Sequence, residues 1–108
     1  MKHACYKSIV FSLLAGMVPS LFAAPDASRQ AELLYLLKHD CGSCHGMTRQ
    51  GGLGPPLLPE NLQGRPQLLM VNTVLDGRPG TPLPPWRGEL SAQDATWLVE
   101  VLRAGEGL

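Results

Sequence analysis

The chain has 108 residues, and its nine acidic side chains balance its nine basic ones, so the formal net charge is zero. Hydrophobic residues form 44% of the sequence, but only 6% of the residues are aromatic. This length allows one small domain with a thin hydrophobic core, and the balanced charge excludes the strongly basic surface typical of nucleic-acid-binding proteins.

The first 23 residues have the pattern of a secretory signal peptide. Basic residues near the start precede an apolar run from Ile9 to Val18, and the small residues Ala23 and Ala24 follow. We expect cleavage after Ala23, which leaves residues 24–108 as the mature domain. The apolar run is shorter than the about 20 residues of a membrane-spanning helix, so we expect no membrane span after cleavage. An uncleaved anchor is the alternative.

Cleavage would remove Lys2, Lys7 and Cys5, so the mature chain would keep seven basic side chains, nine acidic ones and two cysteines. Good helix formers from Ala27 to Lys38 predict the first helix of the mature domain. Its buried face is expected to hold Ala31, Leu34 and Tyr35, with Leu37 extending it. We expect this helix to cross the last one with Tyr35 near Trp97.

Residues 41 to 45 form a C-x-x-C-H sequence, the pattern by which proteins attach haem covalently. Two thiols at this spacing reach the two vinyl groups on one edge of the porphyrin, and the next side chain turns under the ring to the iron. The motif therefore predicts one haem c, with thioether bonds from Cys41 and Cys44 and with His45 as the proximal iron ligand.

Three other uses of two neighbouring cysteines fit less well. Structural zinc usually takes four ligands from two separated pairs, and only one pair is present here. A thioredoxin-like redox pair follows a strand in a βαβ setting, and no strand pattern precedes Cys41. A structural disulfide leaves the adjacent His45 unexplained.

Residues 46–65 follow the motif and show little helical periodicity. A loop of this length counts against a compact domain unless it wraps a cofactor. The run from Gly51 to Pro56 suits backbone that passes close to a ring, and a short helical turn is expected from Pro59 to Leu62. We expect the carbonyl oxygen of Pro55 to accept a hydrogen bond from the free ring nitrogen of His45, because iron-bound imidazoles are normally held by such a partner. The alternative is that Pro55 only forms a turn.

Two further helices are predicted. One begins near Pro66 and ends at Asp76 and Gly77. Its apolar stripe of Leu68, Val71 and Leu75 is expected to pack in the core. The other begins at Ser91 with Asp94 as a capping pair and ends before Gly105. Its expected core residues are Trp97, Leu98, Val101 and Leu102.

Three main helices joined by long loops around one cofactor predict an all-α domain. A chain this short with few large apolar side chains ordinarily needs a staple, and a covalent haem would act as the centre of its core. No paired carboxylates and no base-and-nucleophile arrangement accompany the motif, so we do not expect an enzyme.

The mature chain resembles class I cytochromes c, and more narrowly the small periplasmic c55X-type cytochromes associated with cytochrome cd1 nitrite reductase in denitrifying bacteria. The resemblance covers nearly the whole mature chain and rests on residues 41–47, 51–55, 75–81, 84–86 and 97–99. It implies a small class I cytochrome c fold with Trp86 packed against the haem. It also implies single-electron transfer in the periplasm, with cytochrome cd1 nitrite reductase or the enzymes of haem d1 maturation as partners.

The sequence departs from this family at Leu83. Proteins of this type usually carry methionine here, and its sulfur is the sixth ligand of the iron, whereas leucine cannot ligate. We therefore expect an open or water-occupied distal position first, Met70 as the ligand second, and another residue third. Ordinary core packing is the simpler interpretation of Met70, and a missing thioether should lower the potential or leave the iron open.

The leucine at position 83 bears on which of two functions is expected. An electron carrier needs a six-coordinate or otherwise rigid iron and an exposed haem edge. A diatomic-binding protein would take nitric oxide or carbon monoxide at an open ferrous iron beneath Leu83. A third interpretation is a partner module for haem d1 maturation. Electron transfer is the leading interpretation, because the resemblance over the whole chain outweighs one substitution.

Overall fold

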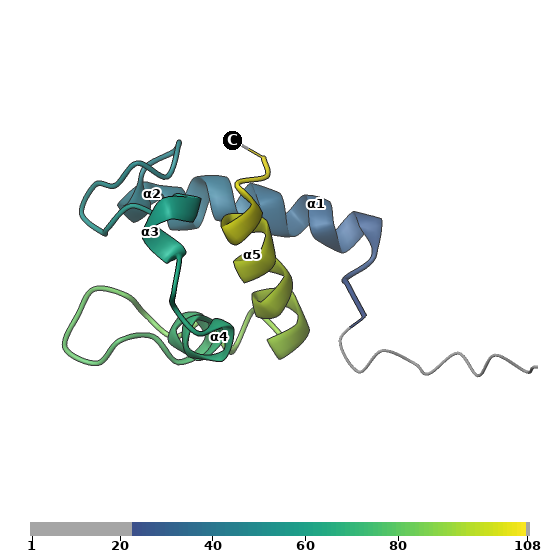
Figure 1. Ribbon diagram of the computed structural model, residues 1–108. Helices are drawn as coiled ribbons and strands as arrows, with labels where there is room; N and C mark the ends of the chain where they lie inside the picture. The colour runs from purple at the N-terminus through teal and green to yellow at the C-terminus, as the bar shows by residue number, and fades with distance from the viewer. Residues whose placement is uncertain (1–22, 108) are drawn as a thin grey trace, which may run out of the picture.

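The computed structural model describes residues 23–107 (Figure 1). Almost all of the predicted signal peptide, residues 1–22, lies outside the described residues. Within residues 23–107 the chain forms helices and loops and no strand, which confirms the predicted all-α class. None of the helices in this part of the chain is long and apolar enough to cross a membrane.

The first helical stretch runs without interruption into the C-x-x-C-H motif. It consists of α1 (Ala27–Leu36), the π-helical segment η1 (Leu37–Cys41) and the single turn α2 (Gly42–His45). Asp26 caps its start, because the carboxylate accepts a hydrogen bond from the backbone N–H of Arg29 at 2.8 Å. The wider turns of η1 change the helical phase just before the motif, and the predicted end at Lys38 is therefore too early.

The predicted buried face of this helix is correct at Leu37 and wrong at the other three residues. Leu33 and Leu37 are buried, whereas Ala31 and Leu34 are exposed and Tyr35 is 66% exposed. The Tyr35 ring packs instead against His39 on the outer face, with the ring centroids 4.2 Å apart. Two apolar stripes at helical spacing overlap within residues 33–37. The stripe that faces the core consists of Leu33, Leu36 and Leu37.

The remaining helices begin and end close to the predicted residues. They are α3 (Pro59–Leu62), α4 (Gln67–Asp76) and α5 (Ala92–Ala104). Pro66 precedes α4, and Val71 and Leu75 are buried as predicted, but Leu68 is exposed and its assignment to the core is wrong. The capping box predicted for α5 is present, with the Ser91 hydroxyl accepting from the Asp94 N–H at 3.0 Å.

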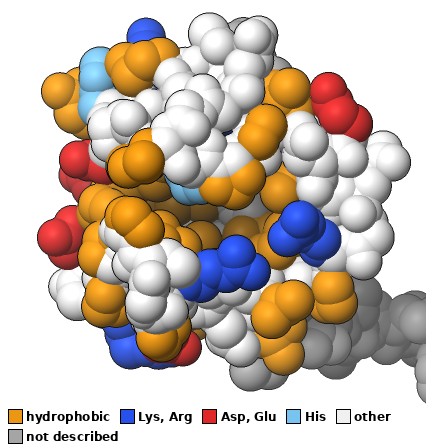
Figure 2. Space-filling view, turned by 90° about the vertical axis from the view of Figure 1, so that its left-hand side faces the viewer, with side chains coloured by type: hydrophobic (Ala, Val, Ile, Leu, Met, Phe, Trp, Pro, Cys, Tyr) orange, Lys and Arg blue, Asp and Glu red, His pale blue; other side chains and the backbone are white. Residues whose placement is uncertain are grey.

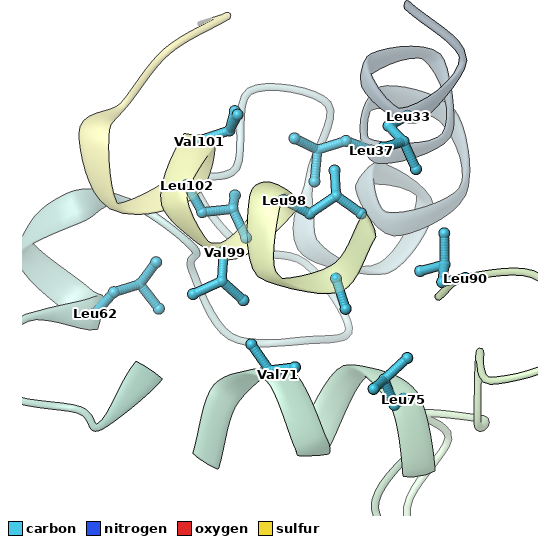
Figure 3. Close-up of a cluster of buried hydrophobic side chains, with 11 residues drawn as sticks. Leu33, Leu37, Leu62, Val71, Leu75, Leu90, Leu98, Val99, Val101 and Leu102 are labelled. Carbon is cyan, nitrogen blue, oxygen red and sulfur yellow. The ribbon is translucent and has the colours of Figure 1, made fainter. Parts of the chain in front are cut away.

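Helix α5 is the centre of the packing. It contacts α1, α3 and α4, and in Figure 1 it crosses between α1 and α4. Figure 3 shows the buried cluster, in which Leu98, Val99 and Leu102 of α5 lie between the leucines of the first helix and Val71 and Leu75 of α4. The predicted core residues of α5 are confirmed, with Trp97 partly buried at the edge of this cluster.

An ion pair joins α1 to the start of α5. The Arg29 guanidinium donates to the Asp94 carboxylate at 2.8 Å and to the carbonyl oxygen of Glu89 at 3.0 Å. The hydrogen bond from Arg29 is the main cause that lowers the pKa of Asp94, and the same contact raises the pKa of Arg29. Asp94 therefore both completes the capping box of α5 and connects α5 to α1.

Candidate functional site

Two long loops lie at the same end of the domain (Figure 1). Residues 46–58 connect α2 to α3, and residues 77–91 connect α4 to α5. Figure 2 shows this end face on, and the surface is hollowed there, with largely hydrophobic walls, a histidine side chain inside and Lys or Arg side chains at its edge. The shape and the apolar lining suit a flat, mostly apolar group.

The C-x-x-C-H residues lie where the first helical stretch meets these loops. Cys41 ends η1, and Cys44 and His45 belong to α2. The thiols of Cys41 and Cys44 are both free, so no disulfide joins them. Both side chains are partly buried, which leaves them available to bond to a group held against α2.

His45 has the hydrogen bond that was expected from the sequence. Its ring nitrogen Nδ1 lies 2.7 Å from the carbonyl oxygen of Pro55. A carbonyl oxygen can only accept, so this contact assigns the proton to Nδ1 and leaves the lone pair of Nε2 for a metal. Such a contact fixes both the tautomer and the ring orientation of an iron-binding histidine.

Backbone hydrogen bonds fold residues 46–58 back onto the motif. The N–H of Gly51 donates to the carbonyl of His45, and the N–H of Gly54 donates to the carbonyl of Cys44, both at 2.8 Å. The loop therefore passes against the imidazole, and a Cβ added at Gly54 would lie 2.8 Å from its Cε1 and Nδ1 atoms. Glycine at position 54 is required for this approach, which agrees with the expectation from the glycine-rich run.

Burial, followed by the charge of Asp40, raises the pKa of the Cys41 thiol to about 11. The thiol is consequently protonated at neutral pH. Among residues 23–107, no three His, Cys, Asp or Glu side chains are grouped so that they could hold a metal ion.

The loop after α4 is closed on itself around Leu83. The N–H of Arg78 donates to the carbonyl of Leu83 at 3.2 Å, and the N–H of Thr81 donates to the carbonyl of Arg78 at 3.1 Å. Its far end is attached to α4, because the N–H of Trp86 donates to the carbonyl of Leu75 at 3.0 Å. Leu83 is thus held in place, partly buried, by backbone contacts that do not depend on its side chain.

Two other candidate residues pack against the hydrophobic cluster. Met70 of α4 and Trp86 are both partly buried beside it. This contact is what core packing predicts for Met70. Sequence reasoning missed Arg49, which is only 7% exposed although it lies in a polar-looking loop. No sequence pattern marks it, because arginine in a loop is normally solvated.

Comparison with known proteins places the chain in a family. The family model of the cbb3-type cytochrome c oxidase subunit III matches residues 28–101. Cytochrome c55X of Pseudomonas aeruginosa is 50% identical over 104 residues, which cover 96% of this chain and 87% of that protein. The chain is a small c-type cytochrome of the c55X type.

This cytochrome is also similar in structure to its relatives. A solved c-type cytochrome NirC is 62% identical with a TM-score of 0.75, and the match covers 76% of this chain and 96% of that one. The dihydro-heme d1 dehydrogenase of Pseudomonas aeruginosa is 35% identical over 94 residues, which cover 87% of this chain but 18% of that enzyme. This c55X-type cytochrome is therefore an electron carrier with one covalently bound haem c, and not an enzyme.

Proposed function

We propose that this cytochrome carries single electrons in the periplasm, to or within the nitrite reductase system that uses haem d1. The proposed partners are cytochrome cd1 nitrite reductase and the enzymes that complete haem d1. One observation carries the choice of partners: a segment of the dihydro-heme d1 dehydrogenase is similar to 87% of this chain. The dehydrogenase thus contains a segment similar to this chain. This similarity supports a role for the separate cytochrome in the same haem d1 system.

The proposed haem site consists of residues at the hollowed end of the domain. Cys41 and Cys44 would form the two thioethers, and Nε2 of His45 would bind the iron while Pro55 holds Nδ1. Trp86 would pack beside the ring. When bound, the haem supplies a one-electron iron couple whose potential depends on its ligands and surroundings. The protein's part is to fix His45 and to limit the access of water.

Export to the periplasm is part of the proposal and rests on the signal-peptide pattern of residues 1–23. Covalent haem would use both cysteines of the mature chain, Cys41 and Cys44. No thiol would then remain for unwanted disulfides in an oxidising compartment. Detection of the mature chain in a periplasmic extract, with its N-terminus at Ala24, is the direct test of this part.

Electron transfer is tested by mixing the reduced holoprotein with oxidised cytochrome cd1 nitrite reductase in a stopped-flow spectrometer. We expect the ferrous spectrum to decay at a rate proportional to the enzyme concentration, and the same experiment with the dihydro-heme d1 dehydrogenase tests the second partner. An unrelated periplasmic cytochrome of similar potential is the control. Oxidation no faster than that control with both enzymes contradicts the proposal.

A second candidate function is the binding of a diatomic gas, and Leu83 is the observation that favours it. Leucine has no donor atom, and Leu83 belongs to the loop of residues 77–91, one of the two loops at the hollowed end of the domain. An open ferrous iron would bind carbon monoxide, so the absorption spectrum of the ferrous form with and without carbon monoxide tests this function. A low-spin ferrous spectrum that carbon monoxide does not change excludes it.

A further inference from the structure

Arg49 carries its charge on a buried side chain. Its Nη1 atom is buried and makes no hydrogen bond, and none of the ion pairs formed within residues 23–107 includes it. Burial lowers the pKa of Arg49, but a guanidinium stays protonated in proteins. An isolated buried charge is unfavourable for folding, so the position of Arg49 needs another explanation.

The backbone of Arg49 is also in an unusual conformation. Its φ angle is 63°, which makes it the one residue other than glycine with a positive φ in the described part of the chain. Its N–H donates to the carbonyl of Gly46 and its carbonyl accepts from the N–H of Leu57, both at 2.9 Å. A left-handed conformation persists at such a residue only where the surroundings impose it, and such residues cluster at functional sites.

Arg49 lies beside the C-x-x-C-H motif, because its N–H donates at 2.9 Å to the carbonyl of Gly46, the residue that follows His45. Its charge acts on the Cys41 thiol, where it opposes the rise in pKa that burial causes. On its other side, Nη2 faces the end of the chain, because a Cβ added at Gly107 would lie 3.4 Å from it. None of the ion pairs formed within residues 23–107 brings an acidic side chain to Arg49.

We propose that Arg49 is a positioning charge that raises the reduction potential of the haem, an inference that rests on the proposed attachment at Cys41 and Cys44. Ferric haem carries one more positive charge than ferrous haem. A buried cation repels that extra charge, and this repulsion is strong where water is excluded. Arg49 thereby offsets part of the fall in potential expected from leucine at position 83, since a thioether ligand would have favoured ferrous iron.

The first test is a redox titration of three holoproteins followed by absorption spectroscopy. Arg49→Gln removes the charge, and we expect the ferric-to-ferrous ratio at a fixed potential to rise about tenfold, which is about 59 mV for a one-electron couple. Arg49→Lys keeps the charge and should retain most of the wild-type potential. The control is Arg65→Gln, because Arg65 is exposed and its guanidinium makes no hydrogen bond within residues 23–107.

A second pair of variants leaves Arg49 intact. Gly107→Asp places a carboxylate beside Nη2 of Arg49, and Gly107→Asn places a neutral side chain of the same shape there. Gly107 has a φ angle of 70°, a conformation that both asparagine and aspartate tolerate better than most residues. We expect the aspartate variant to have the lower potential and the asparagine variant to match the wild type.

The outcomes separate this inference from the proposed function. A chain that carries no covalent haem overturns both. Haem that is attached and has the same potential in the wild type and in Arg49→Gln overturns the inference alone, as does a fall in Arg49→Lys as large as in Arg49→Gln. A loss of thermal stability in Arg49→Gln without a change in potential shows a purely structural role and also overturns it.

Discussion

At the scale of single residues, the site depends on the lack of a side chain at Gly54. The imidazole of His45 occupies the space in which a Cβ of residue 54 would lie, at 2.8 Å from two ring atoms. Because the ring is held by Pro55 and the backbone by Cys44, neither can move aside without breaking a hydrogen bond. The placement of the histidine is therefore determined partly by a residue that makes no side-chain contact.

We predict that Gly54→Ala displaces His45 and weakens its binding to iron. The expected result is an absorption spectrum that differs from that of the wild-type holoprotein, because the iron loses its proximal nitrogen ligand, while the thioethers survive. The control is Gly88→Ala, because a Cβ at Gly88 would meet no atom within 4 Å. An absorption spectrum of Gly54→Ala that matches that of the Gly88→Ala protein contradicts the assignment of His45 as the proximal ligand.

Leu83 is the second residue at which one side chain decides the chemistry. Its backbone is fixed by the contact with Arg78, so a change of side chain should leave the loop intact. We predict that Leu83→Met gives a six-coordinate iron, a higher potential and no reaction with carbon monoxide, because a thioether favours ferrous iron. Absorption spectra and a redox titration measure all three, with Leu83→Ile as the control. An unchanged spectrum in Leu83→Met would mean that another residue already holds the sixth position.

At the scale of elements, the link between α1 and α5 is sensitive to pH. The hydrogen bond from Arg29 lowers the pKa of Asp94 below its usual value of about 3.9. A carboxylate whose pKa is lowered by folding stabilises the fold above the unfolded pKa, and that contribution is lost as the pH falls through the folded pKa. The stabilisation that this ion pair contributes should therefore decrease as the pH falls below about 4.

We predict that Asp94→Asn destabilises the protein by about 1 kcal/mol at neutral pH, since it weakens the capping box and removes the ion pair. The variant should lose less stability than the wild type between pH 5 and about pH 3, because it lacks the titrating group. Urea unfolding followed by circular dichroism at these two pH values measures the difference. Glu32→Gln, which changes the more exposed partner of Arg29, is the control. An equal acid dependence in Asp94→Asn and the wild type would contradict this account.

The elements also show which features of the structure could be predicted from the sequence. Helix α5 was predicted closely because its start and end are marked by a capping box and by Gly105, which are local signals. The buried face of α1 was wrong because residues 33–37 satisfy two apolar stripes, and only the packing of α5 selects between them. The contact of His45 with Pro55 followed from the chemistry of iron ligands. The burial of Arg49 could not be predicted, since it depends on the loop and the chain end together.

At the scale of the whole molecule, the hydrophobic core lies among the helices, and the candidate site lies beside it at the end where the two loops meet. The buried hydrophobic residues come from the helical elements and from Leu90, and none comes from residues 46–58. That loop is connected to the motif mainly by backbone hydrogen bonds such as those of Gly51 and Gly54. A small domain with so little apolar burial in its loops needs an additional centre of packing, and covalent haem would supply it.

We predict that the double variant Cys41→Ser, Cys44→Ser loses order in the loops before it loses the helices. Without haem, the amides of Gly51 and Gly54 should exchange with solvent much faster than in the holoprotein. Amides in the centre of α5 should exchange slowly, and at similar rates, in the variant and in the holoprotein. The reason is that local opening depends on buried apolar contact, which the loops would lack and α5 would keep through Leu98 and Val99. Hydrogen exchange followed by mass spectrometry resolves the two segments. If α5 loses as much protection as the loops, the haem supports the whole domain as one cooperative unit. If the loops are equally protected in the variant and in the holoprotein, they are stable without haem. Either result contradicts the prediction.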